Sequence, residues 1–284
     1  MRQTSVEKLI SEALAIEAEA AKEAGALGFM ARALVQATMP HRRAAGTEFV
    51  RHNGAFTLSM LSPSAVGLPY GSVPRLLIAW LCTEAVKTRS RELVLGDSLS
   101  GFMRELDLVP TGGRWGSIGR LKEQTKRLFS TTVSCIYEGE DKTALLGYRV
   151  ADKALLWWDA KRPDQGSLWA STVSLTEPFY REVVDHPVPV DMRALKALKR
   201  SPLALDLYCW LTFRMSYLKR DTEIPWAALA AQFGSDYGRL RAFKEALLGE
   251  LRKVQAVYPE ARVGTGKSGL LLQPSRPHIP HKAS

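Results

Sequence analysis

Residues 97–137 have the sequence DSLSGFMRELDLVPTGGRWGSIGRLKEQTKRLFSTTVSCIY, which predicts a short helix, a turn and a second helix that leads into a strand. Asp97 is a good N-cap for the first helix, because its carboxylate can accept the free backbone N–H groups of the first turn. The turn contains Gly112 and Gly113, which tolerate the positive φ values of a chain reversal. Gly116 or Ser117 then caps the second helix. Two helices joined by such a turn and followed by a β-hairpin form a winged helix.

The second helix of this stretch has an apolar side and a basic side. The apolar side recurs at helical spacing and is predicted to be buried; it consists of Ile118, Leu121, Thr125, Leu128 and Phe129. The opposite side carries Gly116, Arg120, Glu123 and Arg127, with Lys122 and Lys126 on its flanks. Since winged helices lay this helix in the DNA major groove, we predict DNA contacts from Ser117, Arg120, Lys122, Lys126 and Arg127. Taken alone, the same helix also fits a solvated charged surface.

The charge of the whole chain favours a polyanionic partner. Its 284 residues include 39 Lys and Arg against 29 Asp and Glu, a formal net charge of +10. The sequence pI is about 9.6, and a protein this basic attracts nucleic acid. A basic surface without such a role is the alternative. The apolar fraction of 46% and the charged fraction of 24% are those of a soluble globular protein with room for two domains.

The cysteines and the N-terminus indicate the compartment. Cys82, Cys135 and Cys209 are odd in number and lack C-x-x-C spacing, so we expect buried free thiols in a reducing cytosol. The N-terminal segment alternates charged residues with Ala and Leu and has no apolar signal-peptide core. No run reaches the roughly 18 apolar residues that a membrane span needs. We therefore expect a cytoplasmic protein without membrane contact.

The chain before and after the opening stretch supplies further elements. Residues 5–37 favour an N-terminal helix that Pro40 ends, and residues 41–53 predict a basic linker, either a phosphate contact or a solvated connection. A strand is expected at 55–61. Pro74 at the first helical position opens a central, buried helix. After the basic helix, three further strands are predicted as the wing, at 131–137, 143–150 and 154–159.

The second half repeats this plan. PDQG at 163–166 marks the predicted domain boundary, and Ser201-Pro202 opens a second long, buried helix. Helices are predicted over 225–233 and from Asp236 to about Val257, followed by a terminal hairpin. We therefore predict an α+β protein of tandem winged-helix (helix-turn-helix) domains with an N-terminal helix. The predicted parts are 1–53 (N-terminal helix and basic linker), 54–162 (first winged-helix domain) and 163–284 (second winged-helix domain and C-terminal tail).

The long helix of the second half repeats the division into two faces. Its predicted buried side consists of Leu240, Phe243, Leu247, Leu251 and Val254, and Tyr237, Gly238, Arg241, Glu245 and Arg252 face away. The predicted DNA contacts here are Arg239, Arg241, Lys244, Arg252 and, in the terminal hairpin, Lys267. An Arg near a helix start can bind guanine through two hydrogen bonds worth ~1–3 kcal/mol of discrimination, which makes Arg120 and Arg241 candidates for base readout. The flanking cations are expected to bind phosphate.

Other motifs do not indicate an active site. VGTGKSG at 263–269 resembles a phosphate-binding loop, but Ala261 occupies the position of the first Gly and a strand follows in place of a helix. His278 and His281 form only a weak metal-binding pattern. We find no nucleophile and base constellation. We therefore expect a binding protein with no catalytic residue, no metal and no cofactor, and an enzyme of nucleic-acid metabolism is the third alternative.

Several long strings carry a family resemblance. They are GLPYGSVPRLLIAWLCTEAVKTRSRELVLGDSLSGFMRELDL at 67–108, GGRWGSIGRLKEQTKRLFS at 112–130 and DHPVPVDMRALKALKRSPLALDLYCWLTFRMSYL at 185–218. They strongly resemble plasmid replication initiators of the RepA C-terminal-domain family, over roughly residues 56–272. The expected N-terminal helix lies outside this region.

The resemblance implies a role that charge and spacing do not. It implies a cytoplasmic initiator that binds repeated sequences (iterons) at a plasmid origin, promotes opening of the adjacent AT-rich DNA and recruits the host initiator and replicative helicase. It also implies monomers on iterons and a homodimer that represses or pairs origins, which is plasmid copy control. The runner-up is a winged-helix transcriptional regulator (autorepressor) without an initiation role.

Overall fold

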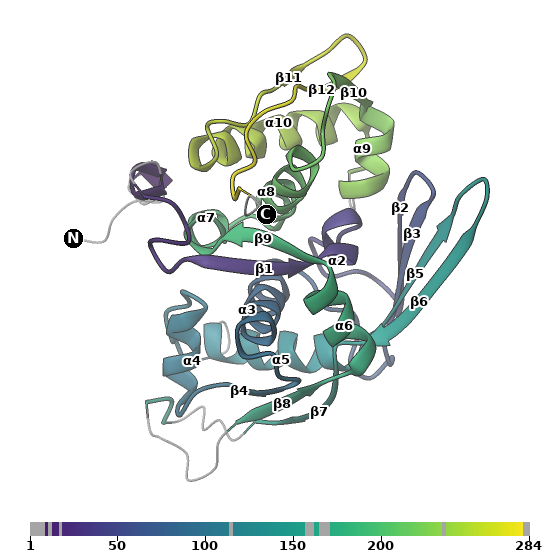
Figure 1. Cartoon of the computed structure of the whole chain (residues 1–284). Helices are drawn as coiled ribbons and strands as arrows, with labels where there is room; N and C mark the ends of the chain where they lie inside the picture. Colours follow the sequence, from purple (N-terminus) through teal and green to yellow (C-terminus); the bar gives the residue numbers. More distant parts are fainter. Residues whose placement is uncertain are drawn as a thin grey trace.

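A long buried helix occupies the middle of each half of the protein (Figure 1). The computed structural model describes residues 9–10, 13–16, 19–113, 116–156, 162–164, 171–234 and 237–280. Helix α3 (Ser72–Thr88) is buried along most of its length, as is α8 (Pro202–Met215), which confirms both predicted central helices. Helix α8 opens at Ser201-Pro202 as predicted, with the Ser201 hydroxyl as the N-cap that accepts from the Ala204 N–H. The start of α3 was predicted wrongly, because the helix begins two residues before Pro74, after Gly71 at φ 78°.

Each central helix belongs to a unit with the same order of elements. The first unit continues with β4 (Glu92–Val94), α4 (Leu99–Glu105), α5 (Ser117–Ser130), β7 (Ala151–Leu155) and β8 (Thr172–Leu175). The second unit continues with β10 (Thr222–Pro225), α9 (Trp226–Phe233), α10 (Leu240–Val257), β11 (Val263–Thr265) and β12 (Gly269–Leu272). The three strands of each unit form an antiparallel sheet, in the orders β4-β8-β7 and β10-β12-β11. The last strand of each unit is therefore central in both sheets.

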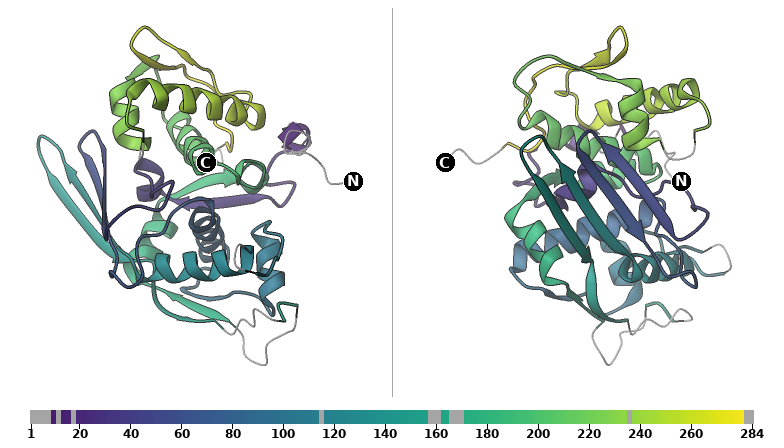
Figure 2. Two further views of the ribbon diagram at one scale, coloured as in Figure 1. Left: turned by 180° about the vertical axis from the view of Figure 1, so that it is seen from behind. Right: turned by 90° about the vertical axis from the view of Figure 1, so that its right-hand side faces the viewer.

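A separate four-stranded sheet interrupts the first unit. It has the order β2-β3-β5-β6 and consists of β2 (Glu48–Asn53), β3 (Phe56–Leu61), β5 (Thr132–Glu138) and β6 (Thr143–Arg149). In the right-hand view of Figure 2 it forms a face of its own. The prediction that β5 and β6 form the wing is wrong, because β5 pairs with β3 and buries Val133 beside Leu58 and Met60. The linker prediction is wrong over 48–53, which is the strand β2.

The N-terminal part of the chain joins the two halves. Strand β1 (Leu27–Ala31) pairs antiparallel with β9 (Pro187–Asp191), and the short helix α2 (Arg32–Gln36) follows β1. The predicted helix is therefore wrong at 27–31. A Cβ at Gly28 would lie 2.4 Å from the sulfur of Met192, so β1 approaches the start of α7 closely and a larger residue there would displace the flexible Met192 side chain. Helices α6 (Glu177–Asp185) and α7 (Met192–Leu198) flank β9.

The sheet of the first unit extends past the boundary predicted at 163–166. Strand β8 lies after that boundary and pairs with β4 and β7, with Val173 and Leu175 fully buried. Residues 157–161, 165–170 and 235–236 lie outside the described residues, and with them part of the strand predicted at 154–159, part of the predicted boundary and the predicted start of α10. The three cysteines are buried and free, as predicted. Among the described residues, no helix is both long enough and apolar enough to cross a membrane.

Candidate nucleic-acid interface

The turn before α5 is tied by two hydroxyl groups. The Ser117 N–H donates to Thr111 Oγ1 (3.0 Å), and Ser117 Oγ accepts from the Thr111 N–H (2.9 Å). A Cβ at Gly116 would lie 2.2 Å from the Thr111 carbonyl oxygen, so only glycine fits this reversal. Ser117 thus holds the turn that positions α5. At helix α4, the N-cap is Ser98 and not the predicted Asp97, because the Ser98 hydroxyl accepts from the Gly101 N–H.

Helix α5 has the two faces that its sequence predicts. Ile118, Leu121, Thr125 and Leu128 are buried, and Phe129 packs partly buried against the core. Gln124 is buried as well, which periodicity did not indicate, and its side-chain oxygen accepts from the Tyr70 N–H (2.9 Å). On the outer face, Arg120, Glu123 and Lys126 are exposed, while Lys122 is half-buried.

Arg127 is a correction to the predicted DNA face. Its side chain is buried, donates to the Leu68 carbonyl (3.1 Å) and forms an ion pair with Glu123 (2.8 Å). Its guanidinium also lies over the Tyr70 ring, 5.5 Å from the centroid. A Cβ at Gly67 would lie 2.6 Å from Nη1. Helical spacing places Arg127 outside, but residues 67–70 cover that position, so Arg127 anchors this segment to α5 and offers little surface to DNA.

Helix α10 also has a buried apolar stripe, which differs from the prediction only at the first residues of the helix. Phe243, Leu247, Leu251 and Val254 are buried as predicted, but Leu240 is 49% exposed because it occupies the first position of the helix. Tyr237 was predicted to face away and instead packs edge-on against Phe243, with ring centroids 5.6 Å apart.

The basic side chains of the second unit lie outside this stripe. Arg239 and Arg252 are exposed. Arg241 is exposed too and forms an ion pair with Glu245 (3.0 Å). The Lys244 amine lies over the Trp226 ring, 4.8 Å from its centroid. Each of these cations except Lys244 is therefore open to solvent on the surface of α10.

The turn between β11 and β12 carries Lys267 into solvent. Glu223 of β10 orders this turn, because its carboxylate accepts from the Ser268 N–H (2.5 Å) and from the Ser268 hydroxyl (3.1 Å). The backbone hydrogen bond from Ser268 holds the pKa of Glu223 below its ordinary value. Strand β12 follows directly, so the GKS motif has the strand context of a hairpin and not the helix that a phosphate-binding loop needs.

Helices α5 and α10 lie on the same side of the protein (Figure 2). In the view from behind, both are turned toward the viewer, α10 above and α5 below. The side view places both at the same edge, away from the β5–β6 hairpin. Helices α5 and α10, which carry the exposed residues Arg120, Lys126, Arg241 and Arg252, therefore lie on one side of the molecule.

A buried ionic cluster joins α3 of the first unit to α8 of the second. The Arg75 guanidinium of α3 donates two hydrogen bonds to the Asp206 carboxylate of α8, each 2.7 Å long. His41 Nε2 lies 2.7 Å from the second Asp206 oxygen. Burial alone would raise the pKa of Asp206, but the charge of Arg75 and the His41 hydrogen bond hold it below its ordinary value. Burial lowers the pKa of His41 below its ordinary value.

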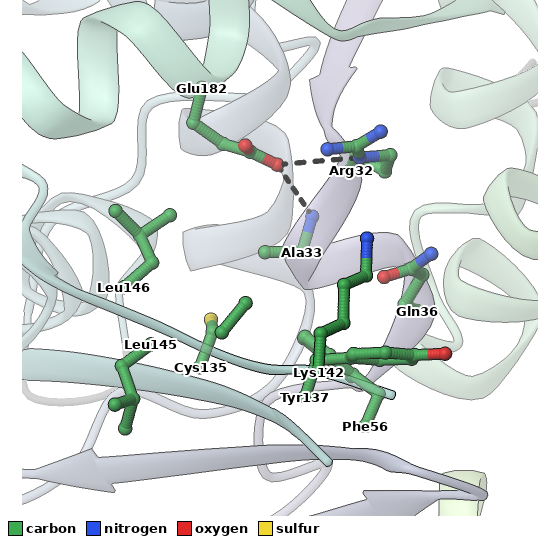
Figure 3. A pocket seen from close by; sticks show the side chains of 11 residues that line it. Arg32, Ala33, Gln36, Phe56, Cys135, Tyr137, Lys142, Leu145, Leu146 and Glu182 are labelled. Carbon is green, nitrogen blue, oxygen red and sulfur yellow. Dashed lines mark hydrogen bonds and ion pairs between the residues drawn. The ribbon is translucent and has the colours of Figure 1, made fainter. Parts of the chain in front are cut away.

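A cavity on another side of the protein is shown in Figure 3. It has a volume of about 350 Å³ and lies between the four-stranded sheet and helices α2 and α6. Glu182 accepts from the Ala33 N–H (3.2 Å) and lies 3.9 Å from Arg32 Nε. Burial raises the pKa of the Cys135 thiol in its wall to about 12. Cys135 is therefore a neutral thiol at physiological pH and a poor nucleophile.

Of the two histidines in the weak metal-binding pattern, His278 packs against tyrosine side chains. His278 Nδ1 lies 2.7 Å from the Tyr208 hydroxyl, and its ring stacks on Tyr258 with centroids 4.6 Å apart. His281 lies outside the described residues. Within the ranges that the structure describes, no cluster of three or more His, Cys, Asp or Glu side chains is suited to hold a metal ion.

Comparison with known proteins yields one family and one fold. Residues 68–228, more than half of the chain, match the family described as plasmid encoded RepA protein. No curated protein matches the chain. Among solved structures, the crystal structure of selenomethionine derivatives of domains 2 and 3 of RctB is similar, with a TM-score of 0.56 and 12% sequence identity. The similarity covers 86% of this chain and 95% of that chain, and at this identity it shows the fold alone.

Proposed function

Because the chain belongs to the family of plasmid-encoded RepA proteins, we propose that it is a replication initiator that binds repeated duplex sequences (iterons) at its plasmid origin. In this proposal the two units are winged-helix domains, and α5 and α10 are the helices that enter successive major grooves. The observation that carries the proposal is the presence of two units of the same topology whose basic helices lie on the same side of the molecule.

The exposed cations have different proposed roles. Arg120 lies in the first turns of α5 and Arg241 in the first turn of α10, where winged helices contact base edges. Lys122, Lys126, Arg239, Lys244, Arg252 and Lys267 are proposed to contact phosphate, which sets affinity and its salt dependence. Ser117 is proposed to act mainly by fixing the turn before α5.

The later steps of initiation rest on the family alone. We propose that the bound protein promotes opening of the AT-rich DNA beside the iterons and recruits the host initiator and the replicative helicase in the cytoplasm. A homodimer that represses the gene or pairs origins belongs to the same proposal. These steps need no catalytic residue or cofactor of this chain.

Footprinting on the DNA that flanks its own gene tests the proposal. We expect several protected direct repeats of about two helical turns each, next to an AT-rich tract. A single protected palindrome would instead favour a transcriptional regulator without an initiation role. If no flanking DNA were protected, both the initiator and the transcriptional-regulator function would be contradicted.

Substitution of the two arginines tests base readout on the footprinted repeat. Arg120→Ala and Arg241→Ala should each weaken binding to the repeat by ~1–3 kcal/mol more than binding to random duplex. Lys126→Ala should weaken both and reduce the slope of log affinity against log salt by about 0.9, the value for one phosphate contact. Equal losses on repeat and random DNA for the arginine variants would contradict base readout.

A further inference from the structure

A basic groove lies where the two units meet, beside the N-terminal half of α5. It has a volume of about 920 Å³. Its cationic side chains come from three separate segments: Arg42 and Arg43 before β2, Arg120 of α5, and Lys199 with Arg200 between α7 and α8. The groove therefore gathers charge from both units, and it opens next to the exposed face of α5.

The charges of this groove are not compensated by its own acids. Arg42, Arg43, Arg120 and Arg200 are exposed and have no carboxylate partner among the described residues. Glu123 is the acidic side chain in the lining, and it forms an ion pair with Arg127 (2.8 Å). Like charges in one groove repel and raise the local concentration of anions, so this arrangement favours a polyanionic ligand.

The segments that carry these charges are anchored. His41 precedes Arg42 and Arg43 in the chain and is bound to the buried Asp206 carboxylate (2.7 Å). Lys199 precedes Arg200 and forms an ion pair with Asp107 (2.5 Å). These contacts restrict the backbone next to Arg42, Arg43 and Arg200. Less conformational entropy is therefore lost when the arginines bind a ligand.

The α5 wall of the groove leaves room for a close approach. Gly119 lies in the groove on the exposed side of the helix, and a Cβ there would have no protein atom within 4 Å. Packing within the protein therefore does not require glycine, which weakens a helix relative to alanine. An open backbone at this position is suited to a ligand that runs along the helix.

We propose that this groove binds the sugar-phosphate backbone of duplex DNA between the two major-groove contacts of α5 and α10. The inference rests on the proposed function, because the duplex must lie across the side that carries both helices. Arg42, Arg43 and Arg200 are then phosphate contacts that join the two DNA-reading units into one continuous interface. Their role is independent of base sequence.

The test is a salt titration of DNA binding by the full chain carrying Arg42→Gln, Arg43→Gln and Arg200→Gln together. Affinity is measured on a duplex with the footprinted repeat and on a random duplex of the same length. The slope of log affinity against log salt should fall by about 0.9 for each lost contact, up to about 2.7 for the triple variant. The loss of affinity should be equal on both duplexes. In an ethylation-interference assay, the wild-type protein should show interference at the phosphates between the two protected major grooves. The triple variant should no longer show it.

Lys142→Gln is the matched control, because it removes a charge from the β5–β6 turn, away from α5 and α10 (Figure 2). It should leave the slope unchanged. A triple variant with the wild-type slope, or a loss on the repeat alone, would overturn the groove proposal while the wild-type footprint still supports DNA reading. A wild-type protein that binds neither duplex would overturn the proposed function itself. Variant-sensitive binding of ATP in calorimetry, with an unchanged DNA slope, would assign the groove to a free nucleotide instead.

Discussion

Replacement of Asp206 by asparagine should lower the free energy of unfolding by about 3 kcal/mol, because it leaves a buried guanidinium without its counter-charge. The Arg75 side chain is only 3% exposed, and both of its hydrogen bonds to Asp206 are 2.7 Å long. Asparagine has nearly the same shape as aspartate. The substitution therefore removes charge and one acceptor without opening a cavity.

The magnitude follows from the remaining partners of Arg75. Removal of one partner of a buried ion pair costs ~3–5 kcal/mol. The guanidinium keeps three backbone acceptors, the carbonyl groups of Met39 (2.6 Å), Gly71 (2.7 Å) and Pro40 (3.2 Å). These three carbonyls still solvate part of its charge, which places the expected loss near the lower end of the range.

Urea denaturation followed by far-UV circular dichroism measures this loss. The midpoint should fall with little change in the m-value, since the native fold is retained. Asp141→Asn, in the exposed β5–β6 turn, is the matched control and should change the free energy by less than about 0.5 kcal/mol. A loss for Asp206→Asn no larger than that of the control would refute the reasoning, because it would mean that Arg75 is adequately solvated without the carboxylate.

The pH dependence of the two proteins adds an independent check. Asp206 has a pKa below its ordinary value of 3.8 in the folded protein, so its ionised form stabilises the fold above that pH. This contribution is lost as the pH falls through the lower, folded pKa. The difference between wild type and Asp206→Asn should therefore be full at neutral pH and shrink in acid. His41, with a pKa below 6.5, should also make wild type less stable as the pH falls below 6.5.

Three further outcomes are expected. Ser201→Ala should lower the free energy of unfolding by about 1 kcal/mol in urea denaturation, because the hydroxyl that caps α8 is lost. Gly119→Ala should raise that free energy by ~0.8–1 kcal/mol, because alanine favours the helix and no protein atom lies in the way. The same variant should bind DNA more weakly in a titration. If the variant bound DNA with wild-type affinity, no ligand would approach this position. Cys82, Cys135 and Cys209 should not react with a thiol reagent until urea unfolds the protein, because burial raises the pKa of all three.

Helical periodicity was sufficient for the helices that present the candidate site. The spacing of Ile118, Leu121 and Leu128 placed the buried side of α5 correctly, and Phe243 and Leu247 did the same for α10. Such patterns succeed because a helix that packs on one side must repeat apolar residues every three to four positions. The exposure of Arg120 follows from the same pattern.

The pairing of strands could not be read from the same local patterns. Alternation predicted β5, β6 and β7 correctly as strands, but the prediction that they form one wing is wrong, because β5 and β6 pair within the sheet that begins with β2 and β3. Any strand with one apolar side can pair with several others, since the backbone hydrogen bonds are the same for every sequence. The predicted helix at 27–31 failed for a similar reason, because contact with β9 overrides the helix propensity of alanine-rich sequence.

The two basic helices, the turn that contains Gly112 and Gly113 and the family to which the chain belongs can be read from the sequence alone, because they depend on neighbouring residues and on long local strings. The burial of Arg127, and the groove that Arg42, Arg43, Arg120 and Arg200 share, follow only from contacts between distant segments. The exposure of a long side chain depends on which distant segment covers it. The convergence of charges from three segments depends on how the two units are joined, here through the buried pair of Arg75 and Asp206.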